Sequence, residues 1–309
     1  MTDDVKALQQ ERTQIHHDLM DNKIPKRVPV TANLSLQPLA EWAGIDLHAV
    51  HWKPSLIAEA ADKLCQVLYS DTLPASGSLR YPSFYEVLES QSFVMSSSGF
   101  IQHPETVGLE VEDYDYLIEK PYDCLLERVI PRQYKALNLD DPVSMALALT
   151  KSYMGYSGDN QELAPIFGKL IEKYGYYPGP PPGSSGFTAT PFDFLADQLR
   201  GFRNISMDIR RMPGKVLEAC EALYPIVFKK GLPANPSNYG AVAMPLHMPT
   251  YMREKDFEKL YWPTFKRQLD EYASHGVHAS IFCEDNWMRY LDYLYELPTD
   301  TIKIGRAHV

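Results

Sequence analysis

The feature that most constrains the fold is residues 241–297, where apolar runs alternate with helical patterns. One apolar run ends at His247, and a second ends at Cys283, Glu284 and Asp285. Between them, apolar residues recur at the three- and four-residue spacing of one helix face. This strand–helix–strand–helix order predicts parallel strands whose C-terminal ends carry polar side chains.

The helical part of this segment contains its own start and stop signals. Pro263 has no amide hydrogen, so we expect a short helix to about Tyr261 and a second helix from near Pro263. Gly276 predicts the end of the second helix. Residues 278–283 are then a buried strand, with Ile281, Cys283 and Asp285 on one face.

The rest of the chain shows a similar alternation, with further helices expected at 141–154 and 161–174. The proline- and glycine-rich residues 176–186 are interpreted as a loop over the mouth of a barrel rather than as an interdomain linker. The pattern predicts an α/β fold with a parallel sheet, either doubly wound or a (β/α)₈ barrel. Strands are predicted near Val28, Val67, Phe187, Ala243, Ala279 and Ile302.

Composition narrows the function classes. The net charge of −10 argues against non-specific binding to nucleic acid or to an anionic membrane. No apolar run of membrane-spanning length occurs. The four cysteines lie far apart and form no CxxC pair, which suits a reducing compartment. We therefore expect a cytoplasmic protein without nucleic-acid or membrane partners.

Four side chains at predicted strand ends are candidates for chemistry. Asp71 is a proton donor or a substrate-binding acceptor, or else a turn cap. His247 is a general base, a metal ligand or a hydrogen-bonded rim histidine. Cys283 is a zinc thiolate or a buried apolar thiol, and Glu284 is an acid, a base or a ligand.

Other candidates have simpler alternatives. Asp193 either faces a pocket or caps the helix from Phe194, and capping is favoured. Asp285 or Asn286 is expected to cap a helix from Trp287. Four tyrosines could stack on a large planar ligand, but packing within loops is favoured for them. They are Tyr153, Tyr156, Tyr176 and Tyr177.

Several motifs in order resemble the uroporphyrinogen decarboxylase superfamily over nearly the whole chain. They are Tyr69-Ser-Asp71, Thr190-Pro-Phe-Asp193, Leu199-Arg-Gly-Phe-Arg203 with Met207-Asp208 and Pro213, and the Tyr-Trp-Pro of residues 261–263. The resemblance implies a (β/α)₈ TIM barrel over residues 28–303, preceded by a helical extension at 1–27. It also implies an active site at the strand ends, with Asp71, His247 and Glu284 catalytic and with Phe192 and Asp193 contacting the substrate.

The superfamily combines cofactor-free decarboxylation of tetrapyrrole acetates with zinc-dependent methyl transfer between corrinoids and thiols. Residues 31–37 lack the arginines that the decarboxylases use for a substrate with eight carboxylates. Cys283 matches a zinc cysteine, but Ile281 replaces the zinc histidine of the methyltransferases.

The resemblance therefore predicts an enzyme that is a methyltransferase of corrinoid-linked one-carbon metabolism, acting on a small molecule or a corrinoid protein. It implies zinc at Cys283 and, as methyl donor, either a methylated corrinoid or an amine or ether. The alternatives are a decarboxylase without a cofactor, acting on a tetrapyrrole-like or other carboxylated substrate, and a non-catalytic corrinoid- or tetrapyrrole-binding protein.

The chain is also expected to be a fragment. About six of the eight strands of a barrel are predicted, and residues 304–309 are interpreted as a non-native tail. His308 is therefore not a candidate ligand.

Overall fold

The structure, a computed structural model, describes residues 2–78 and 80–306. The chain forms two compact units, one of Met1–Pro104 with Gln133–Gly179 and one of Glu105–Arg132 with Pro180–Val309. Each unit has a hydrophobic core of its own. The boundary at Gly179 falls within the proline- and glycine-rich stretch 176–186.

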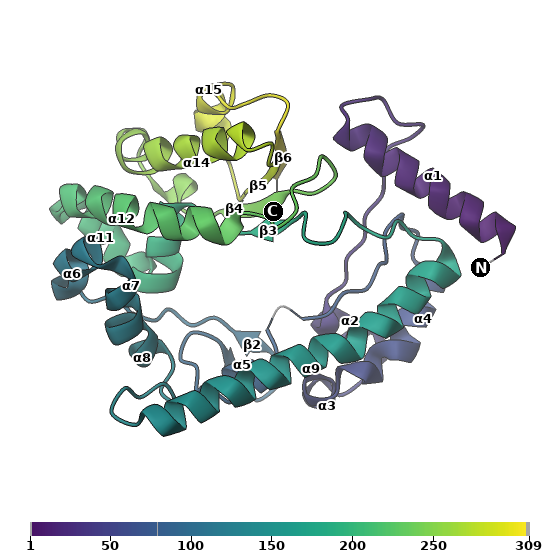
Figure 1. Ribbon diagram of the computed structural model, residues 1–309, viewed down its shortest axis with the longest axis horizontal. Helices are drawn as coiled ribbons and strands as arrows, with labels where there is room; N and C mark the ends of the chain where they lie inside the picture. The colour runs from purple at the N-terminus through teal and green to yellow at the C-terminus, as the bar shows by residue number, and fades with distance from the viewer. Residues whose placement is uncertain (1, 79, 307–309) are drawn as a thin grey trace. The chain divides into compact units, whose positions relative to one another are not determined.

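The first unit is built mainly of helices, the longest of which is α9 (Pro142–Tyr174) (Figure 1). The prediction of two separate helices there is wrong, because α9 is continuous over 33 residues. Gly155 does not break it. A Cβ at Gly155 would lie 2.8 Å from the Cβ of Ser83 in α5 (Pro82–Tyr85), so this glycine lets the two helices approach closely.

Residues 28–32 and 66–71 do not form the strands predicted for them. The alanine-rich helix α4 (Ala58–Val67) runs into the second segment, because its sequence favours helix. In the first segment, the amide of Val30 donates to the Asp71 carboxylate (2.8 Å) instead of to a neighbouring strand. A side chain therefore replaces the backbone partner that a regular strand would use.

The remaining elements of the first unit are short, apart from an N-terminal helix that packs on α9. Val94 and Met95 pair antiparallel with the next short strand. These elements are α1 (Asp3–Met20), α2 (Leu36–Ala43), α3 (Leu47–Trp52), η1 (Pro54–Ile57), β1 (Val94–Met95) and β2 (Ile101–Gln102).

The second unit contains a parallel sheet of four strands in the order β3-β4-β5-β6. The strands predicted near Phe187, Ala243, Ala279 and Ile302 are thereby confirmed, and the protein is a mixed α/β protein. Of the expected non-native tail, residues 304–306 belong to the last strand, and Ala307, His308 and Val309 lie outside the described residues. The strands are β3 (Gly186–Phe187), β4 (Val242–Leu246), β5 (Ala279–Cys283) and β6 (Ile302–Arg306).

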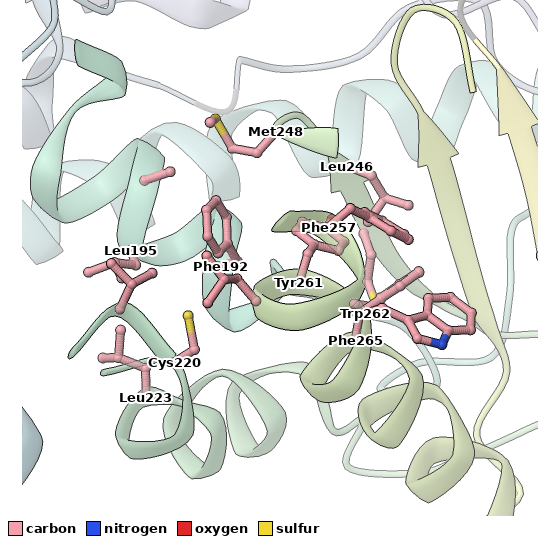
Figure 2. Packing of buried hydrophobic residues seen from close by; sticks show 14 of the residues in the cluster. Phe192, Leu195, Cys220, Leu223, Leu246, Met248, Phe257, Tyr261, Trp262 and Phe265 are labelled. Atoms are coloured by element: carbon pink, nitrogen blue, oxygen red, sulfur yellow. The ribbon is translucent and has the colours of Figure 1, made fainter. Parts of the chain in front are cut away.

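The core of the second unit joins one face of this sheet to the helices α12 (Pro213–Gly231) and α14 (Trp262–Ser274). Figure 2 shows this core, with Cys220 and Leu223 of α12 near Phe192 and with Tyr261 beside Phe257. Wider, π-helical turns form η6 (Phe257–Tyr261), directly before α14. The change of helix at Pro263 and the stop at Gly276, whose φ is 66°, agree with the prediction.

Other helical elements of the second unit surround this core. No helix within residues 2–78 and 80–306 is long and apolar enough to cross a membrane. The elements are η2 (Val111–Asp113), α6 (Tyr114–Glu119), α7 (Pro121–Cys124), η3 (Leu125–Val129), α8 (Ile130–Gln133), α10 (Pro191–Asp193), η4 (Phe194–Arg200), α11 (Phe202–Arg211), η5 (Pro249–Tyr251), α13 (Glu254–Asp256), η7 (Met288–Tyr290) and α15 (Leu291–Leu294).

The contact of β3 with the end of α12 depends on glycine. A Cβ added to Gly186 would lie 2.1 Å from the carbonyl oxygen of Gly231, which is backbone and cannot rotate away. We expect Gly186→Ala to lower the free energy of unfolding by about 1–3 kcal/mol, measured by urea denaturation followed by tryptophan fluorescence. Gly214→Ala in α12 is the control, because its Cβ would meet no atom within 4 Å. Equal midpoints for the two variants would contradict the prediction.

Candidate functional site

Two of the predicted site residues meet at the C-terminal edge of the sheet. Leu246 and Cys283 are register partners at the ends of β4 and β5, so the residues that follow them, His247 and Glu284, are neighbours. The imidazole Nδ1 lies 3.4 Å from Glu284 Oε2, and the two side chains are 40% and 37% exposed. A histidine and a carboxylate are thus paired where solvent or a substrate reaches them.

A third member of the site, Asp197, was not predicted from the sequence. It lies in η4, and its Oδ2 is 3.8 Å from His247 Nδ1. The only sequence signal for it is its position four residues after Asp193, which places both side chains on neighbouring parts of one helical face. The imidazole therefore has a carboxylate from the sheet, Glu284, and one from a helix.

Asp197 has an unusual affinity for protons. Burial raises the pKa of Asp197 to about 7; the negative charges of Asp193 and Glu284 act in the same direction, and His247 opposes them. A carboxyl group with a pKa near 7 exchanges protons readily at neutral pH. Together with His247, it gives the site a proton donor and a proton acceptor.

Asp193 lies beneath this cluster and is completely buried. Its carboxylate accepts hydrogen bonds from the hydroxyls of Tyr261 (2.6 Å) and Thr190 (3.0 Å) and from the amide of Met248 (3.0 Å). Thr190 itself is the N-cap of α10, accepting from the Asp193 amide. Asp193 is therefore not the helix cap favoured from the sequence, and its oxygens are occupied by protein donors.

Two of the π-helical segments carry residues of this site. Asp197 lies within η4, and Tyr261 is the last residue of η6. Wide turns of this kind often occur at functional sites. A third such segment, η3, lies elsewhere in the same unit.

Cys283 is buried in the hydrophobic core. Burial raises the pKa of Cys283 to about 12, so the thiol keeps its proton at neutral pH. Within residues 2–78 and 80–306, no three His, Cys, Asp or Glu side chains are grouped to hold a metal ion. The donor set around Cys283 does not fit a zinc site.

Asp71 belongs to the first unit, where its carboxylate is fully buried and engaged. Arg27 donates to both carboxylate oxygens at 2.6 Å, and Arg12 Nε lies 3.4 Å from Oδ1. Val30 donates through its amide. These contacts indicate a structural ion pair within the first unit, in place of the acid or substrate acceptor suggested by the sequence.

The contacts of Phe192, Asp285 and Asn286 indicate structural roles for these candidates. Phe192 is completely buried against Tyr261, with ring centroids 5.8 Å apart. Asn286, rather than Asp285, accepts the amide of Met288 and caps the following turn. The backbone of Asp285 is left-handed, with φ of 56°, and not extended. Asp285 therefore does not lie on the strand face that Ile281 and Cys283 share.

The four tyrosines considered for stacking lie in the first unit. Tyr177 stacks on the His16 ring at 4.2 Å, and the Arg12 guanidinium lies over the Tyr176 ring. Tyr156 packs edge-on against Tyr81, whereas Tyr153 is exposed. Three of the four thus have packing partners.

Comparison with protein-family models finds no family that matches the chain, and comparison with curated proteins finds no match.

Proposed function

We propose that this protein is an enzyme of the uroporphyrinogen decarboxylase superfamily that transfers a methyl group in corrinoid-linked one-carbon metabolism. The observation that carries the proposal is the cluster of His247, Glu284 and Asp197 at the carboxyl ends of parallel strands. Active sites of parallel α/β proteins lie at this edge. The pKa of Asp197 near 7 suits it to general acid catalysis.

The fold proposed with this function is a (β/α)₈ barrel. The sheet face opposite α12 and α14 carries the apolar side chains Phe187 and Phe282, which are 57% and 42% exposed. Parallel sheets normally have both faces covered, and a barrel would turn this face inward. In the first unit, parallel bridges join Leu34 to Ala75 and Thr72 to Tyr177, as expected for further segments of parallel order.

The proposed reaction removes a methyl group from an amine or ether donor, with a corrinoid as the substrate that accepts it. The bond between the methyl carbon and the donor heteroatom breaks, and its electron pair stays on the heteroatom. The methyl carbon forms its new bond to the cobalt of the corrinoid substrate, whose cob(I) state supplies the electron pair. Asp197 transfers its carboxyl proton to that atom, so the donor leaves as a neutral amine or alcohol. His247, which is exposed to solvent, then returns a proton to Asp197, and Glu284 stabilises the imidazolium.

The charge of the site favours methyl transfer over the alternative of decarboxylation. Its ionisable groups are the carboxylates of Asp193 and Glu284, the imidazole of His247 and Asp197, which carries a negative charge only after it has lost its proton. A substrate with many carboxylates would be repelled by the negative charges, whereas a neutral amine or ether donor would not. The same acid could protonate a carbon after loss of carbon dioxide, so decarboxylation is the second candidate.

In the test, the protein and cob(I)alamin are mixed with one methyl donor at a time. The donors are trimethylamine, dimethylamine and methyl phenyl ether. We expect an enzyme-dependent loss of the cob(I)alamin absorbance with at least one donor. Uroporphyrinogen is assayed in parallel for release of carbon dioxide. Carbon dioxide release without methyl transfer would replace the proposal by decarboxylation. Tight cobalamin binding with no turnover would indicate a binding protein, and no reaction at all would also contradict the proposal.

A further inference from the structure

The buried carboxylate of Asp193 joins three elements that meet below the candidate site. Thr190 belongs to the start of α10, Tyr261 ends η6, and Met248 follows β4. Each donates one hydrogen bond to the carboxylate, at 3.0, 2.6 and 3.0 Å. A fully buried acceptor with three donors is a rigid connection, since breaking any bond leaves a buried polar group unpaired.

One of these bonds acts on the backbone next to the site. The Met248 amide belongs to the peptide bond that begins at His247, so Asp193 Oδ1 fixes the chain directly after the imidazole. The imidazole lies 3.4 Å from Glu284 and 3.8 Å from Asp197. At such separations a small backbone shift decides whether proton transfer occurs.

From this geometry we infer that Asp193 is a positioning residue, which holds His247 between Glu284 and Asp197 without touching the substrate. The inference rests on the proposed function, because it assumes that His247 and Asp197 carry out the chemistry. It differs from the role suggested by the sequence, in which Asp193 contacted the substrate or capped a helix.

The titratable groups that face Asp193 belong to several elements. Tyr261 comes from η6, His247 follows β4, Asp197 lies in η4 and Cys220 lies in α12. Burial raises the pKa of Asp193, and the hydrogen bonds from Tyr261 and Met248 oppose this. The charge of Asp193 in turn contributes to the raised pKa of Asp197, so Asp193 affects the site electrostatically as well as through the backbone.

The test compares two tyrosine-to-phenylalanine variants of the same unit. Tyr261→Phe removes a donor from Asp193. Tyr114→Phe is the matched control, because the buried Tyr114 hydroxyl likewise donates to a buried carboxylate, that of Asp208 (2.8 Å). Both variants should lose a similar amount of stability, seen as similar downward shifts of the urea midpoint. Only Tyr261→Phe should change the site.

The first measurement needs no substrate. In protein labelled with ¹⁵N-histidine, the His247 signals are those missing from His247→Gln. We expect Tyr261→Phe to change their chemical shifts and the pH dependence of those shifts, and Tyr114→Phe to leave both as in the wild type. Asp193→Asn should give the larger change if it folds; Tyr261→Phe decides the outcome if it does not.

The second measurement is the methyl transfer proposed above. We expect Tyr261→Phe to lower kcat about tenfold or more with little change in KM, and to shift the pH profile. Unchanged His247 signals in folded Tyr261→Phe and Asp193→Asn would overturn the inference. Changed signals in a protein without methyl transfer would instead overturn the proposed function and leave the structural role of Asp193 standing.

Discussion

Asp197→Asn should lower the turnover of the proposed methyl transfer by roughly 100-fold or more, the usual contribution of a positioned general acid. Asparagine has nearly the same shape but cannot donate the carboxyl proton. Because the pKa of Asp197 is about 7, the wild-type rate should fall as the pH rises above 7, when the acid loses its proton. The variant should lack this limb of the pH profile.

The same substitution should have the opposite effect on stability. The pKa of Asp197 is higher in the folded protein, about 7, than the roughly 3.9 of an unfolded aspartate. The folded state therefore binds the proton more tightly, and this group lowers stability as the pH rises from about 4 to about 7. At pH 8, Asp197→Asn should unfold at a higher urea concentration than the wild type.

Asp270→Asn is the control for both effects. Asp270 is in the same unit, but its carboxylate is at the surface and pairs with Lys266. We expect this variant to keep the wild-type rate and to change stability by less than about 1 kcal/mol. An Asp197→Asn variant with wild-type turnover would remove the general acid from the proposal.

Asp71→Asn should destabilise the first unit by about 3–5 kcal/mol, the usual loss when one partner of a buried ion pair is removed. The change would leave the guanidinium groups of Arg27 and Arg12 without their carboxylate. Asp62→Asn is the matched control, since the Asp62 carboxylate is partly exposed and pairs with Lys173. That variant should lose less than about 1 kcal/mol in urea denaturation.

The ion pair of Asp71 should also appear in the acid stability of the protein. Burial raises the pKa of Asp71, but the hydrogen bonds from Arg27 and Val30 and the charges of Arg27 and Arg12 outweigh it, and the net pKa is lowered. A lowered pKa stabilises the folded state above the unfolded value of about 3.9, and this stabilisation is lost as the pH falls below it. Normal stability with lost turnover in Asp71→Asn would restore the catalytic role implied by the resemblance.

The part of the fold that could be predicted has short-range causes. Apolar runs ending at His247 and Cys283 specify β4 and β5, and parallel pairing then brings His247 beside Glu284. Residues 28–32 were misread because the Asp71 carboxylate takes a backbone amide that a strand partner would take. Such a contact joins residues far apart in the sequence, so local pattern does not reveal it.

The candidate site was only half predictable for a related reason. Asp197 has no local motif, and its proton affinity arises from burial and from Asp193 and Glu284. The importance of Tyr261 follows from its hydroxyl reaching Asp193, whereas its sequence position shows only an apolar helix face. Properties that arise from three-dimensional packing among distant side chains need coordinates.

The wide turns of η4 determine the angle between two hydrogen-bonded side chains that hold its ends in the second unit, which we call its anchors. At its N-terminal end lies the hydrogen-bonded Asp193, and at its C-terminal end Arg200 is paired with Asp208 at 2.7 Å. A chain shorter by one residue in this segment would rotate one anchor against the other by the angle between successive residues, which is about 100° in an α-helix and smaller in the wider π-helical turn. Relatives that keep both anchors should therefore conserve the length of this segment even where its residues differ.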